Sequence, residues 1–311
     1  MKECLLYVFS GFLESGKTTL IQETLLDPQF QSDESNLILV CEEGTKGYDD
    51  AFLKQVNAQI VMVDDVSQLN EDFLEACEQH CHPDRVLVEL NGMWSVDRFL
   101  DLVFPLRWIL VQILSTVDAS TFDLYLTNMR KIVYEQLRHS ETIIFNRCNR
   151  TTNQLYLRNN IKAMNRGAQI IYENENGTIE PLHEASLPFA MDSSITLSDH
   201  DYGIWYMDAL EHPRKYEGKQ ITYQAKVYPS PKAQASAYVL GREAMVCCSE
   251  DTSLIALWVF TEQELPEAGT WLQISGTISV AYDADYGGEV CMIKETERKV
   301  ITHLEDYVYF T

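Results

Sequence analysis

The chain has 311 residues, with 47 acidic and 24 basic side chains and a formal net charge of −23. This acidity argues against a nucleic-acid-binding protein, because such proteins gather Lys and Arg on the face that contacts the phosphate backbone. Hydrophobic residues make up 46% and charged residues 23%, the composition of a soluble globular protein large enough for two domains. No apolar run approaches the roughly 18 residues of a membrane-spanning helix, and the short apolar start does not resemble a secretory signal. We therefore expect a cytoplasmic protein that does not insert into a membrane.

Short apolar runs alternate with helical patterns over residues 1–182. The apolar runs lie at 4–9, 37–41, 60–63, 85–90, 108–117, 142–145 and 168–171. Helical patterns lie between several of them, for example at 71–79, 122–138 and 153–164. This alternation predicts βαβ units and an α/β domain with a mostly parallel sheet.

The pattern changes in the second half of the chain. Residues 183–202 lose the periodicity and gather Ser, Asp and Pro, so we interpret them as a linker. Strand-like pieces follow within 203–311, at 220–228, 237–240, 254–260, 271–280 and 290–293. Short strands without intervening helices predict a small β domain, a barrel or a sandwich, which could be of the oligonucleotide/oligosaccharide-binding (OB) type.

The stretch S-G-F-L-E-S-G-K-T-T at 10–19 follows the first apolar run and precedes a helical pattern. Its G-x4-G-K-T spacing is that of a phosphate-binding loop. The loop N–H groups would surround the phosphates, Lys17 would contact the β- and γ-phosphates, and the Thr18 hydroxyl would bind Mg²⁺. The residues predicted to hold the nucleotide here are Gly11, Glu14, Ser15, Gly16, Lys17, Thr18 and Thr19.

Glu14 is an unusual residue for such a loop, because its carboxylate would repel a triphosphate. Three placements would avoid this: a side chain that points outward, one that contacts a metal or a partner, or one that acts on the γ-phosphate. We favour the outward side chain.

Acidic residues follow two further apolar runs. Glu42, Glu43 and Asp49 come after the run at 37–41, and Glu89 lies near the end of the run at 85–90. Strand ends carry the ligand-responsive loops of α/β sheets. We expect Glu42, Asp49 or Glu89 to orient water or hold the metal ion, and Gly92 to offer its N–H to a γ-phosphate.

With these motifs, roughly the first 180 residues resemble the metallochaperone GTPases of the CobW/HypB/UreG type. S-G-F-L-E-S-G-K-T-T is similar to that family's S-G-F-L-G-A-G-K-T-T, and V-C-E-E-G-T-K-G-Y-D to its V-N-E-F-G-E-x-G-I-D. V-E-L-N-G, T-V-D-A and A-M-N-R-G-A-Q-I resemble its I-E-T-S-G, V-V-D-A and L-N-P-x-A-x-I. The resemblance implies a P-loop NTPase fold and nucleotide-driven delivery of a metal, commonly zinc, cobalt or nickel, to a client protein.

The family's base-reading motif N-K-x-D appears as Asn146-Arg147-Cys148-Asn149. The resemblance implies that Asn146, Arg147 and Asn149 contact the base, with Arg147 stacking where the family has Lys. An amide at 149 offers one acceptor and a donor where a carboxylate would offer two acceptors. GTP is therefore the expected nucleotide, with weakened selectivity for guanine.

The family's internal C-x-C-C metal motif is missing, but the chain has eight cysteines, which suits a reducing compartment. Cys77, His80 and Cys81 have the i, i+3 and i+4 spacing that places them on one helix face, where they could bind Zn²⁺. The alternative is a helix end with one buried cysteine and solvent-facing histidines.

A second cluster lies in G-R-E-A-M-V-C-C-S-E-D, which contains Cys247, Cys248 and Asp251. Adjacent strand residues point to opposite faces, so both thiols could meet one metal only if the chain turns there; otherwise one cysteine is in the core and one is exposed. Most of 203–311 resembles, at modest strength, the C-terminal domain of a two-component permease subunit associated with metal supply, which has a similar R-x-x-M-x-C-C-x-x-D. The resemblance implies metal handling by the two thiols, with Asp251 and Cys291 as further candidate ligands.

These observations lead to three functional hypotheses. The first is a switch that slowly hydrolyses GTP with Mg²⁺ and gates transfer of a metal, expected to be zinc, to a client metalloprotein or a membrane-transport component, and that acts as a homodimer. The second is a nucleotide-sensing adaptor with little or no hydrolysis, suggested by Glu14 and Asn149. The third, a nucleic-acid-binding barrel with a helper NTPase, conflicts with the acidity.

Overall fold

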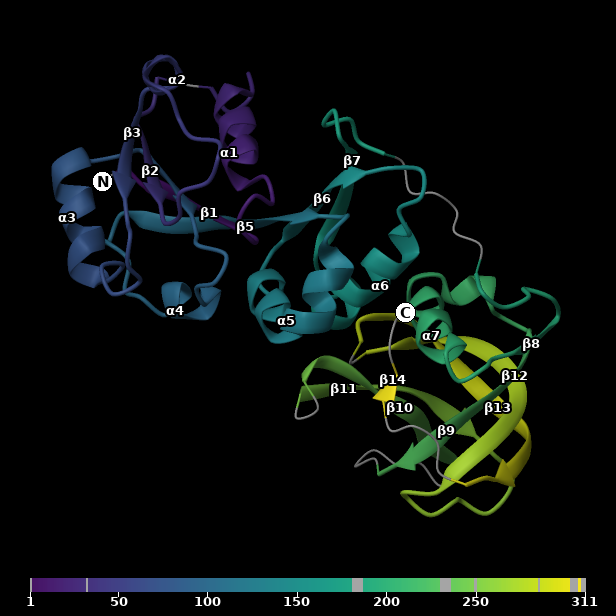
Figure 1. The fold of residues 1–311 in the computed structure, drawn as a ribbon. Coiled ribbons are helices and arrows are strands. Elements are labelled where there is room, and N and C mark those ends of the chain that lie inside the picture. Colours follow the sequence, from purple (N-terminus) through teal and green to yellow (C-terminus); the bar gives the residue numbers. More distant parts are fainter. Residues whose placement is uncertain are drawn as a thin grey trace. The chain divides into compact units, whose positions relative to one another are not determined.

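The computed structural model describes residues 2–31, 33–180, 187–229, 236–248, 251–284, 286–302 and 307–308, with backbone only for 247, 248 and 251. The chain divides into two compact units, Met1–His183 and Glu184–Thr311 (Figure 1). Each unit has a sheet of its own. Among the described residues, no helix is both long and apolar enough to cross a membrane.

A seven-stranded sheet with the order β3-β2-β4-β1-β5-β6-β7 forms the first unit, and every strand pair in it is parallel. The strands are β1 (Cys4–Ser10), β2 (Asn36–Val40), β3 (Ala58–Met62), β4 (Arg85–Glu89), β5 (Trp108–Asp118), β6 (Thr142–Cys148) and β7 (Gln169–Asn174). The helices are α1 (Lys17–Leu26), α2 (Asp50–Gln55), α3 (Glu71–Cys81), α4 (Val96–Leu100), α5 (Phe122–Leu137) and α6 (Gln154–Met164). The predicted parallel α/β sheet is confirmed.

Helices cover both faces of this sheet because alternate strand residues point to opposite sides. On β1, Leu6 and Val8 belong to a buried cluster that includes Leu74 of α3 and Phe99 of α4. Phe9 belongs instead to the cluster that includes Ile21 and Leu25 of α1. Burial on both sides explains why the strands read as continuous apolar runs.

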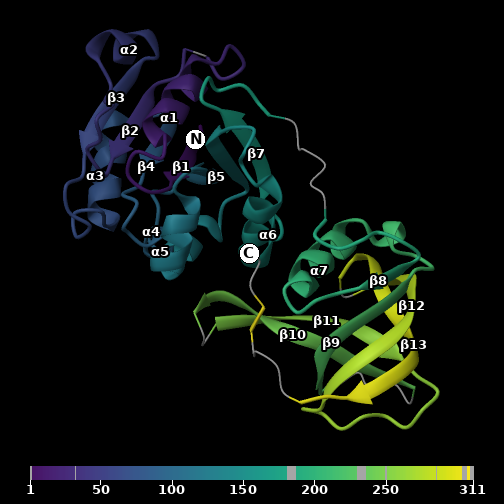
Figure 2. The ribbon, with the colours of Figure 1, turned by 45° about the vertical axis from the view of Figure 1, so that its right-hand side comes forward.

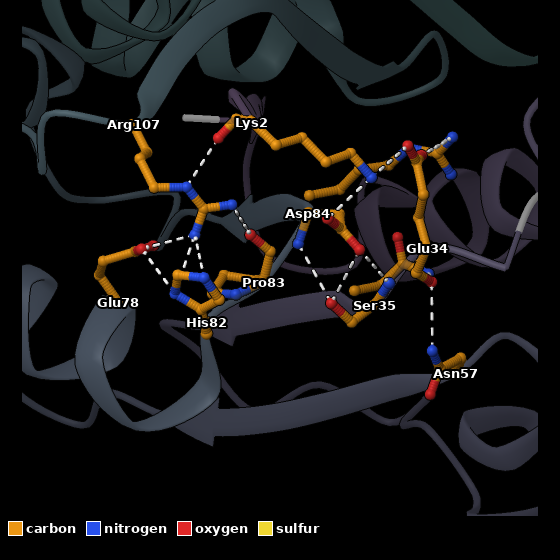
Figure 3. A network of polar contacts seen from close by, with 11 residues as sticks. Lys2, Glu34, Ser35, Asn57, Glu78, His82, Pro83, Asp84 and Arg107 are labelled. Atoms are coloured by element: carbon orange, nitrogen blue, oxygen red, sulfur yellow. Dashed lines mark hydrogen bonds and ion pairs between the residues drawn. The ribbon is translucent and has the colours of Figure 1, made fainter.

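A polar network joins the amino ends of several strands (Figure 3). Just before β5, the Arg107 guanidinium donates to the Lys2 carbonyl at 2.7 Å and to the Glu78 carboxylate at 2.7 Å. Just before β4, Asp84 pairs with the Lys2 ammonium at 2.9 Å and accepts from the Ser35 N–H at 3.0 Å. Hydrogen bonds from Lys2 and Ser35 hold the pKa of Asp84 at about 2. The network ties the segments that lead into β1, β2, β4 and β5.

Five strands close a barrel in the second unit, which confirms the predicted small β barrel (Figure 2). They are β9 (Gln220–Tyr228), β10 (Ala237–Cys248), β11 (Asp251–Phe260), β12 (Trp271–Asp283) and β13 (Gly288–Val300). The order β10-β11-β13-β12-β9 is closed by pairing of β9 with β10, and the β11–β13 pair is parallel. The more specific OB type stays a prediction. Strands β8 (Ser194–Thr196) and β14 (Tyr307–Val308) extend the sheet beside β9 and β10.

The stretch 183–202, which we expected to be a linker, contains β8 and the start of helix α7 (Asp201–Glu211). A short 3₁₀ helix, η1 (Pro213–Lys215), follows α7. Ile195 is fully buried, and Tyr202 donates to the carbonyl of Ile255 on β11 at 3.1 Å. The low periodicity of this stretch reflects a three-residue strand, which is too short to show an alternating pattern.

Candidate functional site

The predicted phosphate loop runs from the end of β1 to the first residue of α1. Gly11 and Gly16 have φ values of 127° and 105°, which only glycine adopts without strain. A Cβ on Gly11 would lie 2.3 Å from the carbonyl oxygen of Thr116. Both glycines are therefore required by the backbone path, as the motif predicts.

Lys17 is buried beneath the phosphate loop, where its ammonium group donates hydrogen bonds. Its Nζ donates to the carbonyl oxygens of Gly11, at 2.7 Å, and Phe12, at 3.0 Å, and to Oε1 of Glu42. The second oxygen of Glu42, Oε2, accepts from the Gly92 N–H at 3.1 Å. Glu42 and Gly92, predicted from separate motifs, thus meet at Lys17.

Gly92 lies unusually close to the phosphate loop. A Cβ at this position would be 2.6 Å from the Phe12 Cα and 2.7 Å from the Gly11 carbonyl oxygen. Both are backbone atoms, which cannot move aside cheaply. Because Gly92 has no side chain, the loop after β4 can lie against the phosphate loop. The Gly92 N–H can then face a phosphate bound there.

Thr18 and Glu89 also come together. The Thr18 hydroxyl donates to Oε1 of Glu89 at 2.6 Å, and the Tyr48 hydroxyl donates to Oε2 at 2.6 Å. Burial and the nearby Glu89 charge raise the pKa of Tyr48, so it remains a donor at neutral pH. Thr18 and Glu89 offer the oxygen ligands that Mg²⁺ binds. Tyr48 was not predicted, because only the folded chain brings residue 48 to residue 89.

Glu14 adopts a left-handed backbone, with a φ of 62°, and its side chain is exposed. The carboxylate accepts from the Thr45 N–H at 2.7 Å and from the Thr45 hydroxyl at 3.0 Å. The Thr45 backbone hydrogen bond is the main reason that the pKa of Glu14 is lowered. Glu14 thus fastens the phosphate loop to the loop after β2.

Asp49 does not join this group. Its carboxylate caps helix α2 by accepting from the Phe52 N–H at 2.7 Å. Its short side chain, one residue before a helix, is typical of an N-cap. The prediction that Asp49 holds the metal or orients water is not supported by this position.

The base-reading segment is only partly assembled. The Asn146 amide donates to the Ser15 carbonyl at 2.6 Å, and Arg147 donates to Asp118 at 2.5 Å and to the Glu14 carbonyl at 3.0 Å. Asn149 uses its amide oxygen locally, accepting from the Thr151 N–H at 2.9 Å and the Thr151 hydroxyl at 2.6 Å. Asn and Asp favour such turns. The one acceptor atom of the Asn149 side chain is therefore already occupied.

A cavity of about 320 Å³ lies next to Asn146 and Arg147. Its wall includes Glu173 at the end of β7, a residue that no motif predicted. Burial, helped by the nearby Glu23 carboxylate, raises the pKa of Glu173. The remaining lining residues are Gly16, Thr19, Leu20, Glu23, Thr116, Ile144, Asn174, Glu175, Asn176 and Gly177. The cavity therefore continues from the phosphate loop to the turn after β7.

Gln136 of helix α5 is a third residue that the sequence did not reveal, after Tyr48 and Glu173. Its Oε1 accepts from the Gly11 N–H at 3.1 Å, and its Nε2 donates to the Trp94 carbonyl at 2.8 Å. It also lines a cavity of about 280 Å³ beside the phosphate loop, together with Phe12 and Tyr125. A glutamine inside a helix carries no signal of such a role.

The first predicted zinc site is not assembled. Cys77 packs in the core, where burial raises the pKa of its thiol to about 11, and the Nδ1 of His80 lies 2.7 Å from the Ala76 carbonyl oxygen. Within the described part of the chain, no three His, Cys, Asp or Glu side chains are arranged to hold a metal ion. The predicted helix face does contain Cys77, His80 and Cys81. Cys77, however, is packed in the hydrophobic core.

The second predicted site falls largely outside the described residues. The side chains of Cys247, Cys248 and Asp251 belong to the part of the chain that the structure does not describe. Along the backbone, Cys248 of β10 pairs with Asp251 of β11. Cys291 is a core residue that is only 2% exposed, and its Sγ lies 3.8 Å from the Ala209 carbonyl oxygen. This burial raises the pKa of its thiol to about 12.

Comparison with known proteins gives two family matches and several distant structures. Residues 173–310 match the DUF1980 C-terminal domain. HypB from Archaeoglobus fulgidus, a hydrogenase maturation factor, is 15% identical, with a TM-score of 0.40 over 56% of this chain and 84% of that chain. The Zn(II)-bound YjiA GTPase from E. coli is 15% identical, with a TM-score of 0.43 over 89% and 95%. No curated protein matches. Residues 5–172, more than half of the chain, match the CobW/HypB/UreG nucleotide-binding domain, and the protein therefore belongs to that family.

Proposed function

We propose that the protein is a metallochaperone-type switch that binds GTP with Mg²⁺ and hydrolyses it slowly. One observation carries the proposal: Lys17, Thr18, Glu89 and the Gly92 N–H converge around the glycine loop. These are the groups that phosphoryl transfer requires, a cation and N–H donors for the phosphates and oxygen ligands for the metal. The family's nucleotide-binding domain supports the same conclusion.

Each residue has a defined part in this proposal. Lys17 would stabilise the charge that develops between the β- and γ-phosphates. Thr18 and Glu89, whose oxygens lie 2.6 Å apart, would hold Mg²⁺ directly or through water. When bound, Mg²⁺ would neutralise charge on the phosphate oxygens. Gly92 would donate its N–H to the terminal phosphate, and Gln136 would keep the Gly11 N–H in place.

The base would occupy the cavity beside Asn146 and Arg147. Guanine presents adjacent N–H donors on one edge, and a carboxylate can accept from both. Asn149 cannot do so while its oxygen is held by Thr151. Glu173, on the wall of the cavity, is a carboxylate that could take this role, which favours GTP over ATP.

The metal and the partner complete the proposal. We assign the transferred metal as zinc, with Cys247, Cys248 and Asp251 as its ligands in the C-terminal unit. The acidic surface implied by a net charge of −23 suits metal cations and a basic partner. The client would be a metalloprotein or a membrane-transport component, and the protein would act in the cytoplasm as a homodimer.

Titration calorimetry and phosphate release test the nucleotide site. We expect K17A to weaken GTP binding by about a hundredfold, because Lys17 supplies charge-assisted hydrogen bonds to phosphate. The exposed Lys54 provides the control variant K54A, which should bind like the unmodified protein. GTP, XTP and ATP compared in the same titration report base choice. Equal binding of GTP by K17A and K54A would contradict the proposed site.

Metal analysis tests the cargo. Protein purified without chelator should contain zinc, and the C247S/C248S double variant should lose it, because thiolates are the strong ligands in the proposed set. C77S/C81S serves as the matched double cysteine control and should keep its zinc. Equal zinc content in the two double variants would remove Cys247 and Cys248 as ligands.

A nucleotide-sensing adaptor is the second candidate. In its favour, Asp49 is occupied as a helix cap, while Glu42 is bound to Lys17 and Gly92. Neither acid is placed to orient water in this state. Tight GTP binding without phosphate release, with or without a partner, would select the adaptor over the slow GTPase.

A further inference from the structure

The Glu42 carboxylate accepts hydrogen bonds from two donors of the predicted phosphate site. One of its oxygens accepts from the Lys17 ammonium and the other from the Gly92 N–H. The exposed fractions of the two charged side chains are only 2% for Lys17 and 9% for Glu42. A lysine ammonium and a backbone N–H are the two donors that a terminal phosphate would need here. In this structure the Glu42 carboxylate already accepts from both donors.

We propose that Glu42 takes the place of a terminal phosphate and thereby determines whether the site prefers a nucleoside diphosphate or a triphosphate. This inference rests on the proposed nucleotide binding. A triphosphate would have to displace the Glu42 carboxylate, whereas a diphosphate would fill the loop and leave it in place. Glu42 is then a specificity-determining residue for the number of phosphates, apart from any role in hydrolysis.

Donor counting explains why the two anions exclude each other. A lysine ammonium has three N–H donors, and Lys17 directs them to the Gly11 carbonyl, the Phe12 carbonyl and Glu42. No donor remains for a γ-phosphate until one of these acceptors leaves. The two carbonyls belong to the loop itself, so Glu42 is the acceptor that can move. Repulsion between a carboxylate and a phosphate in this buried place adds to the exclusion.

Displacement of Glu42 would also affect the loop that follows it. Thr45 is bonded to Glu14, and Tyr48 to Glu89 at 2.6 Å. The Lys46 ammonium donates to the Thr19 hydroxyl at 3.0 Å. The segment 42–48 is thus attached to the phosphate loop and to the predicted Mg²⁺ ligand. A triphosphate that removes Glu42 from Lys17 would disturb these contacts, whereas a diphosphate would not.

The test compares binding of GDP and a non-hydrolysable GTP analogue by calorimetry, with Mg²⁺, in the full chain. We expect E42Q and E42A to bind the analogue about tenfold more tightly than the unmodified protein, because a charge-assisted pair no longer opposes the phosphate. GDP affinity should change by less than about threefold, since GDP does not require Glu42 to move. The exposed neighbour Glu43 provides the control E43Q, which should leave both affinities unchanged.

The outcomes separate this inference from the proposed function. An unchanged ratio of the two affinities in E42Q, or weaker binding of the analogue, would overturn the role of Glu42 while leaving nucleotide binding intact. Absence of binding by the unmodified protein and by both variants would overturn both. E42Q keeps the size of the side chain, so it guards against a folding defect in E42A, and circular dichroism of each variant confirms the fold.

Discussion

The two ends of the parallel sheet use similar hydrogen bonds and ion pairs, but they differ in which donors are used. At the amino ends, Arg107 and Asp84 bind groups beside the strand entrances, including the Lys2 carbonyl and the Ser35 N–H (Figure 3). At the carboxyl ends, Lys17 is bound by Glu42, which belongs to a loop. Lys2, Ser35 and Glu42 all lie within two residues of a strand. What distinguishes Glu42 is that it accepts from the Lys17 ammonium and the Gly92 N–H, the donors that a bound phosphate would need. This comparison separates polar groups that stabilise the fold from those that can exchange partners.

The largest expected effect comes from breaking the amino-end network. R107M should lower the free energy of unfolding by about 3–5 kcal/mol, because it leaves the buried Glu78 carboxylate without its guanidinium partner. Urea denaturation measures the loss, and R98M, at an exposed arginine, is the control. The GTP affinity of the folded R107M protein should be unchanged. A loss below about 1 kcal/mol, or a loss of GTP binding by folded protein, would remove the distinction between the two ends.

A smaller effect is expected from crowding the carboxyl end. G92A places a Cβ 2.6 Å from the Phe12 Cα, so the phosphate loop must shift. We expect about 1–3 kcal/mol of destabilisation and a clear loss of affinity for a GTP analogue. G47A is the matched control, since a Cβ there meets nothing within 4 Å. If G92A and G47A bind the analogue equally well, the Gly92 N–H is not part of the site.

The smallest effect is a dependence on pH at the amino end. The pKa of Asp84 is about 2 in the folded chain and near 3.8 when unperturbed. Its contribution to stability should therefore be complete above about pH 4 and should disappear as the pH falls toward 2. D84N should cost about 1 kcal/mol near neutral pH, where solvent screens the partly exposed pair, and less at about pH 3. Urea denaturation at both values measures this, with exposed D101N as the control. A cost that stays constant with pH would argue against a paired Asp84 carboxylate.

The sequence was informative where function depends on local backbone. The glycine spacing of residues 11–16 predicted the loop, because the positive φ angles at Gly11 and Gly16 are a local requirement. Periodicity predicted the parallel sheet and the small barrel. The strand order, however, depends on which runs pair, and no single run carries that information.

Residues that act through distant contacts could not be found in this way. Gln136 reaches Gly11 across 125 positions, and Tyr48 reaches Glu89 across 41. Two other predicted residues bind a nearer partner in this structure: Asp49 accepts from the Phe52 N–H, and Asn149 accepts from Thr151. Local hydrogen bonds compete with functional ones for the same short polar side chains. A motif names residue types but does not decide this competition.

The closed barrel determines the order in which the two units can fold during translation. Strand β11 pairs with β13 rather than with β12, and β13 is Gly288–Val300. The barrel therefore cannot close until the ribosome has synthesised the last of its five strands. The first unit has its seventh strand by Asn174 and can form its sheet while the barrel is still being translated. Translation that stops between β7 and β13 would thus release a chain with a folded nucleotide site and an open barrel, whose unpaired strand edges invite aggregation.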